Sequence, residues 1–302
     1  MNCSDDTSNH RKGAYALTYT ITARKTLTSE ELAQITELVA ICNEQDGIDL
    51  KVNPGMLEKR SGEHEEDFVC YADGKLVGFL GLYVFHGGEA EVSGMVHPAY
   101  RRKGIFTALQ AQAADACRRR GIPAQLFIVQ RDSQSGKSYR ERIGGHYQFS
   151  EYWMDLGEKQ RATVSGNVLL RPEAASDYET LIWLNVHGFQ MEEERAREMA
   201  ENMAGDPKST THLMIVDDKA VGKISVNKNE GKAFIYGFCV HPDYQGKGYG
   251  RQALAQTIEM LGKEGYQDVS LEVACENSSA LGLYESCGFF VKSANDYYKL
   301  VL

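Results

Sequence analysis

The residues best suited to chemistry form a glycine-rich segment, Val240-His-Pro-Asp-Tyr-Gln-Gly-Lys-Gly-Tyr-Gly250. It follows a predicted strand, 232–240, and precedes a stretch whose apolar residues recur at helical spacing, 254–261. Such a loop presents unpaired backbone N–H groups at the positive end of a helix, which favours an anionic diphosphate. Gly248 and Gly250 leave room for a ligand to approach the backbone. From spacing alone, a tight strand–helix turn without a ligand is an equal alternative.

The spacing differs from the phosphate loop GxxxxGK[ST] and from the dinucleotide motif GxGxxG. Gln245-x-x-Gly248-x-Gly250 instead resembles the Q/R-x-x-G-x-G/A acyl-CoA loop of the GNAT N-acetyltransferases. Downstream, Asn277-Ser-Ser-Ala-Leu-Gly-Leu-Tyr284-Glu-Ser-Cys-Gly-Phe289 resembles the family signature N-x-x-A-x-x-x-Y-x-x-x-G-F. The two motifs occur in the order and at the separation that the family shows.

The resemblance implies acetyl-CoA as co-substrate and assigns roles to particular residues. Backbone amides of the loop would hold the CoA pyrophosphate, and the strand end before it would pair with pantetheine. Tyr284 would be the general acid that protonates the departing CoA thiolate. The implied cofactor-binding residues are Cys239, Val240, Gln245, Gly246, Lys247, Gly248, Tyr249, Gly250 and Asn277. Two alternatives stay open: Asn277 is also a good helix N-cap, and Tyr284 could be packed core.

The sequence does not identify a general base. Many relatives place a glutamate on the strand before the loop, but residues 233–240 contain no carboxylate. Glu272 on the next predicted strand is a candidate base, with a solvent-facing strand position as the favoured alternative. Attack by an already neutral amine, or a base acting through water, would also fit. His97 and His241 each precede a proline, where a role in the turn is favoured over catalysis.

An internal repeat sets the domain organisation. At a constant offset of 144 residues, Val96-His97-Pro98 falls on Val240-His241-Pro242, and Lys103-Gly104 falls on Lys247-Gly248. A period of this length indicates a duplicated domain and not a solenoid. We expect a disordered tail over 1–14, a first GNAT-like domain over 15–156, a linker over 157–167 and a second domain over 168–302. The arrangement resembles tandem, double-domain GNAT proteins.

The first copy departs from the family pattern. Its loop, Arg101-Arg102-Lys103-Gly104-Ile105, is a possible second CoA site, but Phe106 replaces Gly250. The ring either obstructs the diphosphate or packs outward. At the same offset Tyr284 corresponds to Arg140, with Tyr139 one place away, and Asn277 corresponds to Ser133.

Catalysis in the first copy is therefore an open question. A shifted register would restore Tyr139 as acid, and Glu89 or Glu91 would then be available as base. The alternative is a copy retained to shape the substrate cleft and bury apolar surface.

The positioning elements repeat in each copy. In the second copy we expect strands at 168–170, 212–217, 220–227, 232–240, 269–273 and 297–301. We expect helices at 177–189, 192–203 and 278–287. A further helix should follow the glycine-rich loop and end at a C-cap, Gly265. The fold class is α/β: each domain is a mostly antiparallel mixed sheet flanked by helices.

Composition excludes several classes of function. The 302 residues hold 33 Lys and Arg against 42 Asp and Glu, a net charge of −9, which disfavours a nucleic-acid partner. The three arginines 118–120 are better explained as cations at a helix C-terminus. No apolar run approaches a membrane span, and the seven dispersed cysteines indicate neither disulfides nor a metal site. We expect a cytoplasmic protein without metal or membrane partner.

The leading hypothesis is an acetyl-CoA-dependent N-acetyltransferase, active in its second domain, that acetylates a small-molecule amine in a ternary complex. A non-catalytic acyl-CoA-binding or sensing protein is the first alternative. An aminoacyl-tRNA-dependent transferase of the Fem type is the second, although an acidic chain argues against tRNA binding. The acidic run 192–194 is either part of the acceptor wall or, as we favour, solvated helix surface. The sequence predicts neither the acceptor, the acyl-chain preference nor the oligomeric state.

Overall fold

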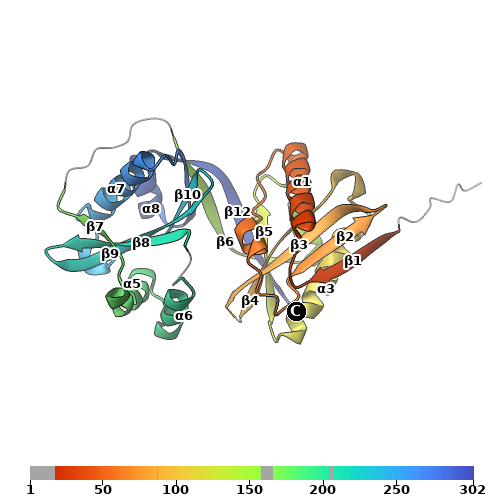
Figure 1. The fold of residues 1–302 in the computed structure, drawn as a ribbon. Coiled ribbons are helices and arrows are strands. Elements are labelled where there is room, and N and C mark those ends of the chain that lie inside the picture. The colour runs from red at the N-terminus through yellow and green to blue at the C-terminus, as the bar shows by residue number, and fades with distance from the viewer. Residues whose placement is uncertain (1–17, 87, 158–165, 204–206) are drawn as a thin grey trace, which may run out of the picture. The chain divides into compact units, whose positions relative to one another are not determined.

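The computed structural model describes residues 18–86, 88–157, 166–203 and 207–302 (Figure 1). The chain divides into two compact units. The first runs to Tyr147 and also includes Tyr297–Leu302, and the second is Gln148–Asp296. The predicted tail over 1–14 and most of the predicted linker lie outside the described residues. Each unit is a mixed sheet flanked by helices, which confirms the predicted fold class.

Before β6, the described residues of the first unit form five strands and four α-helices. They are β1 (Tyr19–Arg24), α1 (Ser29–Asp46), α2 (Pro54–Glu58), β2 (Asp67–Ala72), β3 (Lys75–His86), β4 (Glu89–Val96), α3 (Ile105–Arg119), β5 (Ala124–Gln130) and α4 (Gln134–Ile143). The strands lie in the order β1-β2-β3-β4-β5. Neighbours are antiparallel except β4 and β5, which are parallel and are joined by α3.

Helices cover both faces of this sheet. Phe79 and Met95 pack in one cluster with residues of α1, and Leu80 and Val92 pack in another with residues of α3. Because side chains alternate along a strand, β3 must be apolar on both faces. This explains the apolar run 76–85, which is a central strand.

The second unit repeats this order. Its elements are β6 (His146–Leu156, from residue 148), β7 (Leu169–Pro172), α5 (Tyr178–Phe189), α6 (Glu193–Met203), β8 (Ser209–Val216), β9 (Lys219–Asn229), β10 (Lys232–Val240), α7 (Tyr249–Lys263), β11 (Asp268–Ala274), α8 (Ser278–Ser286) and β12 (Phe289–Val301, to residue 296). The strand order is β6-β11-β10-β9-β8-β7. Only β10 and β11 pair in parallel. Helices α5 and α6 lie on one face, and α7 and α8 on the other (Figure 1).

The last strand differs most from the sequence prediction. We expected it over 297–301, but β12 begins at Phe289. The missed residues include Lys292 and Asp296, which interrupt apolar alternation. The end of β12 belongs to the first unit because Tyr298 and Leu300 pack in that unit's core. Residues 148–156 belong to the second unit, where β6 pairs antiparallel with β11.

Candidate functional site

The glycine-rich segment of the second unit connects β10 to α7. It begins with a 3-10 turn, Pro242–Tyr244, in which His241 Nδ1 accepts a hydrogen bond from the Asp243 amide at 3.3 Å. This confirms the predicted turn role of His241. Gly246 and Gly248 have φ angles of 74° and 79°, in the left-handed region that favours glycine. Gly248 directly precedes α7, so the amides of the first helical turn open onto the loop.

Two side chains of the loop bind its own backbone. Gln245 Nε2 donates to the Val240 carbonyl at 2.9 Å, and Lys247 Nζ donates to the Asp243 carbonyl at 3.0 Å. Both hydrogen bonds close the loop on itself and hold its shape. Any anion held at the start of α7 would therefore be bound chiefly by backbone amides, as predicted for residues 245–250.

Gly250 lies in the first turn of α7, where it packs closely. A Cβ atom built on it would lie 3.4 Å from Leu283 Cδ2 and 3.6 Å from both Phe238 Cζ and Val240 Cγ2. A methyl group fits at these distances. A longer side chain would have to displace one of these groups or extend over the loop.

A fork between β10 and β11 lies next to this loop. The parallel pairing runs from Lys232 opposite Asp268 to Ile235 opposite Leu271 and ends there. Immediately afterwards β10 has a bulge against β9, at Gly237 with a φ of 55°. The bulge turns β10 away from β11, so the backbone beyond it is available to pair with an extended ligand.

Cys239 lies on the far side of the bulge and faces α5. It is 7% exposed, and its Sγ lies 3.6 Å from the Leu184 carbonyl, to which it donates. Burial raises the pKa of the Cys239 thiol to about 11. The side chain is therefore a neutral, packed thiol, and the predicted contact with a ligand falls to the backbone of residues 239 and 240.

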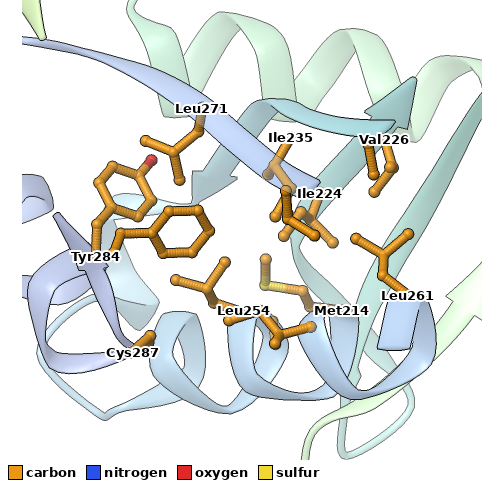
Figure 2. Packing of buried hydrophobic residues seen from close by; sticks show 14 of the residues in the cluster. Met214, Ile224, Val226, Ile235, Leu254, Leu261, Leu271, Tyr284 and Cys287 are labelled. Atoms are coloured by element: carbon orange, nitrogen blue, oxygen red, sulfur yellow. The ribbon is translucent and has the colours of Figure 1, made fainter. Parts of the chain in front are cut away.

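Tyr284, the predicted general acid, projects from α8 into the core on the α7 side of the sheet. It is 8% exposed, and its ring packs near Phe238 and Phe289. Figure 2 shows the hydroxyl oxygen pointing toward Leu271, where the pairing of β11 with β10 ends. Burial raises the pKa of Tyr284 to about 12. Tyr284 is thus a core residue whose protonated hydroxyl points to the fork, and its role as general acid stays a prediction.

Asn277 caps α8. Its Oδ1 accepts a hydrogen bond from the Ala280 amide at 3.0 Å, which confirms the helix N-cap that we considered as an alternative. The predicted contact with pantetheine stays a prediction for its amide nitrogen. The candidate base, Glu272, lies opposite Trp153 of β6 and points to the α5 face, because Leu271 and Val273 face the opposite core. One of its carboxylate oxygens, Oε1, is buried.

The first unit reproduces the loop backbone with different side chains. Arg102 has a φ of 60° where the second unit has Gly246, and Gly104 has a φ of 82°. Arg101 Nε donates to the Val96 carbonyl at 3.0 Å, as Gln245 does to Val240, and its guanidinium also pairs with Asp46. A left-handed arginine is strained by about 1–3 kcal/mol. The loop shape is kept despite this strain.

A cavity of about 490 Å³ lies beside this loop, within the first unit. The parallel pairing of β4 and β5 ends at Val92 and Phe127, and the cavity is lined by the strands beyond that point, the start of α3 and one side of α4. Phe106, which replaces Gly250, neither points away from this site nor fills it. Its ring lines the cavity and packs edge-on against Tyr139, with centroids 4.6 Å apart.

The lining of the cavity shows which of the two candidate residues of α4 faces it. Tyr139 lines it, and its buried hydroxyl has no hydrogen-bond partner among the described residues. Arg140, which the constant offset had matched to Tyr284, instead lies over the Tyr298 ring at 4.6 Å. The sequence analysis missed Gln130, which is 6% exposed, lines the cavity and has a buried Oε1 without a described partner.

Other sequence features have structural explanations. Arg118 and Arg119 lie in the last turn of α3 and Arg120 is its C-cap, which confirms their place at a helix end. They pair with Asp115, Glu65 and Glu66. No described helix combines the length and apolar character that crossing a membrane requires. Within the described ranges, no cluster of three or more His, Cys, Asp or Glu side chains could hold a metal ion.

A family model matches the chain twice. The model described as "Acetyltransferase (GNAT) family" matches residues 32–144 and 174–289. These ranges cover both loops and the segments after them. The double match confirms the tandem arrangement predicted from the repeat.

Full-length relatives and solved structures agree with this match. A mycothiol acetyltransferase of Actinosynnema mirum is 25% identical over 304 residues, covering 93% of this chain and 99% of its own length. A GCN5-related N-acetyltransferase from Sphaerobacter thermophilus superposes with a TM-score of 0.78 at 19% identity, covering 94% of this chain and 95% of its own. A tandem GNAT protein from the clavulanic acid biosynthesis pathway superposes with a TM-score of 0.74 at 17% identity, covering 94% and 98%.

Proposed function

Because the chain belongs to the acetyltransferase (GNAT) family, we propose that its second unit transfers an acetyl group from acetyl-CoA to the amine of a small molecule. The protein is an acyltransferase, and acetyl-CoA is the co-substrate of its family. The assignment to the second unit is ours. One observation supports it. The glycine-rich loop before α7 packs against β10 beside the fork, and the Tyr284 hydroxyl points to the same fork.

The loop and the fork would hold acetyl-CoA in two ways. The pyrophosphate would accept hydrogen bonds from the backbone amides at the start of α7, where the helix dipole favours an anion. The pantetheine arm would pair with the backbone of Cys239 and Val240, beyond the bulge at Gly237. These contacts place the thioester at the fork, and proximity to the amine would supply much of the acceleration.

Tyr284 would act when the carbon–sulfur bond breaks. The acceptor nitrogen attacks the thioester carbonyl carbon, the carbon–sulfur electron pair leaves with sulfur, and the Tyr284 hydroxyl gives its proton to that sulfur. A thiol has an ordinary pKa near 8.5, well below the value of about 12 for Tyr284. In water the proton would therefore stay on the phenol. Removal of solvent from the departing sulfur raises the pKa of the thiol, which makes the transfer more favourable as negative charge develops there. Solvent then restores the tyrosine proton.

The amine must lose a proton on the opposite side of the fork. Glu272 remains our candidate base because it faces the α5 side of the sheet, away from Tyr284. Two alternatives stay open: an amine that is already neutral attacks and gives its extra proton to solvent afterwards, or a water molecule carries the proton from the amine to a base. The acceptor is a small-molecule amine. The Actinosynnema relative is named a mycothiol acetyltransferase, which makes a mycothiol-related amine one candidate.

Calorimetric titration of acetyl-CoA into the wild type and Gly250→Glu tests the loop assignment. The added carboxylate would meet Leu283 or Phe238, or lie over the loop against the diphosphate. We expect the second-unit site to be lost. Gly282→Glu is the matched control, because it adds the same charge on α8 where a Cβ has open space. Undiminished binding to Gly250→Glu would overturn the assignment.

The same titration counts sites in the first unit. We propose a second acyl-CoA site at Arg101–Ile105, supported by the conserved loop shape and the adjoining cavity. Two sites in the wild type and one in Gly250→Glu would support it. Tight binding without turnover of any amine would favour the alternative of a non-catalytic acyl-CoA sensor.

A further inference from the structure

The second unit buries a lysine that the proposed chemistry does not use. Lys223 on β9 is 2% exposed and is among the largest fully buried side chains. No described residue forms an ion pair or hydrogen bond with its Nζ. The contacts that surround it are the Phe189 ring, 5.8 Å from Nζ, and the neighbouring Cys239 thiol, while Glu173 acts on it only at longer range. Burial lowers the pKa of Lys223.

The strand register places this ammonium at the fork. Lys223 lies opposite Cys239 of β10, and its Nζ is 3.8 Å from the point where Gly237 would carry a Cβ. Ile224 and Val226 belong to the core on the α7 side, so Lys223 and Ser225 face α5. The ammonium therefore lies over the bulge, on the face opposite Tyr284.

Other polar groups share this face. Ser225 and Thr211 form a hydroxyl pair 2.9 Å apart, directly beside Lys223 along the strand. Glu272 follows Leu271, the last residue of β11 that pairs with β10, and it faces the α5 side as Lys223 does. A cation and a carboxylate thus face the same side of the fork.

An isolated ammonium is costly to bury, because it loses its hydration without gaining a counter-ion. The chain has 42 acidic residues, yet no described carboxylate pairs with Lys223. We propose that Lys223 binds an anionic group, a carboxylate or a phosphate, on the acyl acceptor. The acceptor is then a small molecule that carries its amine and its anionic group a few bonds apart. This inference rests on the proposed acetyl transfer in the second unit.

The anion site can be tested without knowing the acceptor. Thermal midpoints are measured at constant ionic strength with chloride replaced by acetate or by inorganic phosphate, for the wild type, Lys223→Met and Lys219→Met. Lys219 is the matched control because it is exposed at the start of the same strand. We expect acetate or phosphate to raise the wild-type and Lys219→Met midpoints and to leave Lys223→Met unchanged. The responding anion distinguishes a carboxylate from a phosphate.

A wild type that does not respond, or an equal response in Lys223→Met, would overturn the proposal. Lys223→Gln, which keeps a polar end without the charge, serves if the methionine variant does not fold. Acetyl-CoA is titrated into the same proteins. Binding of acetyl-CoA without an anion response refutes only the lysine site, whereas an anion response without acetyl-CoA binding refutes the proposed transfer.

Turnover of matched amines measures the effect on specificity. β-Alanine is compared with β-alaninamide, and ethanolamine phosphate with ethanolamine. We expect the wild type to prefer the anionic member by about 10- to 100-fold in kcat/KM, mainly through KM, because one charged hydrogen bond is gained. Lys223→Met should equalise each pair. A variant that retains the preference contradicts the proposal.

Discussion

The substitution Tyr284→Phe removes one hydroxyl group and leaves the rest of a buried side chain in place. The tyrosine ring lies 6.1 Å from Phe238 and 6.2 Å from Phe289, measured between ring centroids. Phenylalanine keeps these contacts and the volume of the core. We therefore expect the free energy of unfolding near pH 7 to change by less than about 1.5 kcal/mol.

The expected effect on turnover is much larger. If the hydroxyl protonates the departing thiolate, its loss lowers kcat by about 10²- to 10⁴-fold, which corresponds to about 3–5 kcal/mol in the barrier. The KM for acetyl-CoA should change little, because the loop and the strand end supply the binding contacts. Since the pKa of Tyr284 is about 12, the group stays protonated at neutral pH and should cause no decline in rate below about pH 10.

The same pKa predicts a change in alkaline stability. Burial raises the pKa from 10.0 to about 12, and a rise of this size corresponds to about 3 kcal/mol. The native state holds the proton more tightly than the unfolded state. This contribution is therefore complete below pH 10 and is lost between about pH 10 and pH 12. Tyr284→Phe should remove that part of the decline in unfolding free energy.

The assay is steady-state release of CoA with a turned-over amine, under conditions where added viscogen does not change kcat, so that chemistry limits the rate. Tyr266→Phe is the control, since it removes a hydroxyl from the same unit after the end of α7. An unchanged kcat in Tyr284→Phe would refute the assignment of Tyr284 as the acid. Equal losses in both variants would indicate a general structural effect.

Substitutions test three further local features. Asn277→Ala should lose about 1 kcal/mol of stability with the α8 cap, whereas Asn277→Ser should keep the cap; weaker acetyl-CoA binding in both would show a direct amide contact. Asp67→Ala should cost about 1.5–3 kcal/mol in chemical denaturation, because the buried Arg60 guanidinium loses two hydrogen bonds and keeps Glu66 as its partner, while Asp115→Ala at an exposed pair should stay within about 0.5 kcal/mol. Arg102→Gly should raise the unfolding free energy by about 1 kcal/mol by relieving a φ of 60°, and an unchanged midpoint would show that the arginine is unstrained.

Features that depend on neighbours in the chain could be predicted from the sequence. The repeat, the strand–loop–helix order, the turn at His241 and the α8 cap at Asn277 all follow from residue type and short-range spacing. Their free energies come from backbone conformation and from hydrogen bonds over a few residues. For the same reason both copies could be identified as one fold despite their different loops.

The correspondence between the two copies could not be predicted to the residue. The constant offset selects Arg140, but Tyr139 lines the cavity and Arg140 lies over Tyr298. Successive residues on a helix point about 100° apart, so a single-residue difference decides which side chain enters the cavity. The rotation of α4 depends on packing against a residue from the far end of the chain.

The sequence alone thus determined the family, the duplication and the residues that shape each loop, because these are local patterns. Only the tertiary structure revealed the end of the β10–β11 pairing, the direction of the Tyr284 hydroxyl and the burial of Lys223 over Gly237. A lysine in a strand of alternating residues is ordinarily solvent-exposed, and nothing adjacent to it in the sequence indicates otherwise. Its burial depends on α5 and the β10 bulge, which are close to it only in the folded protein.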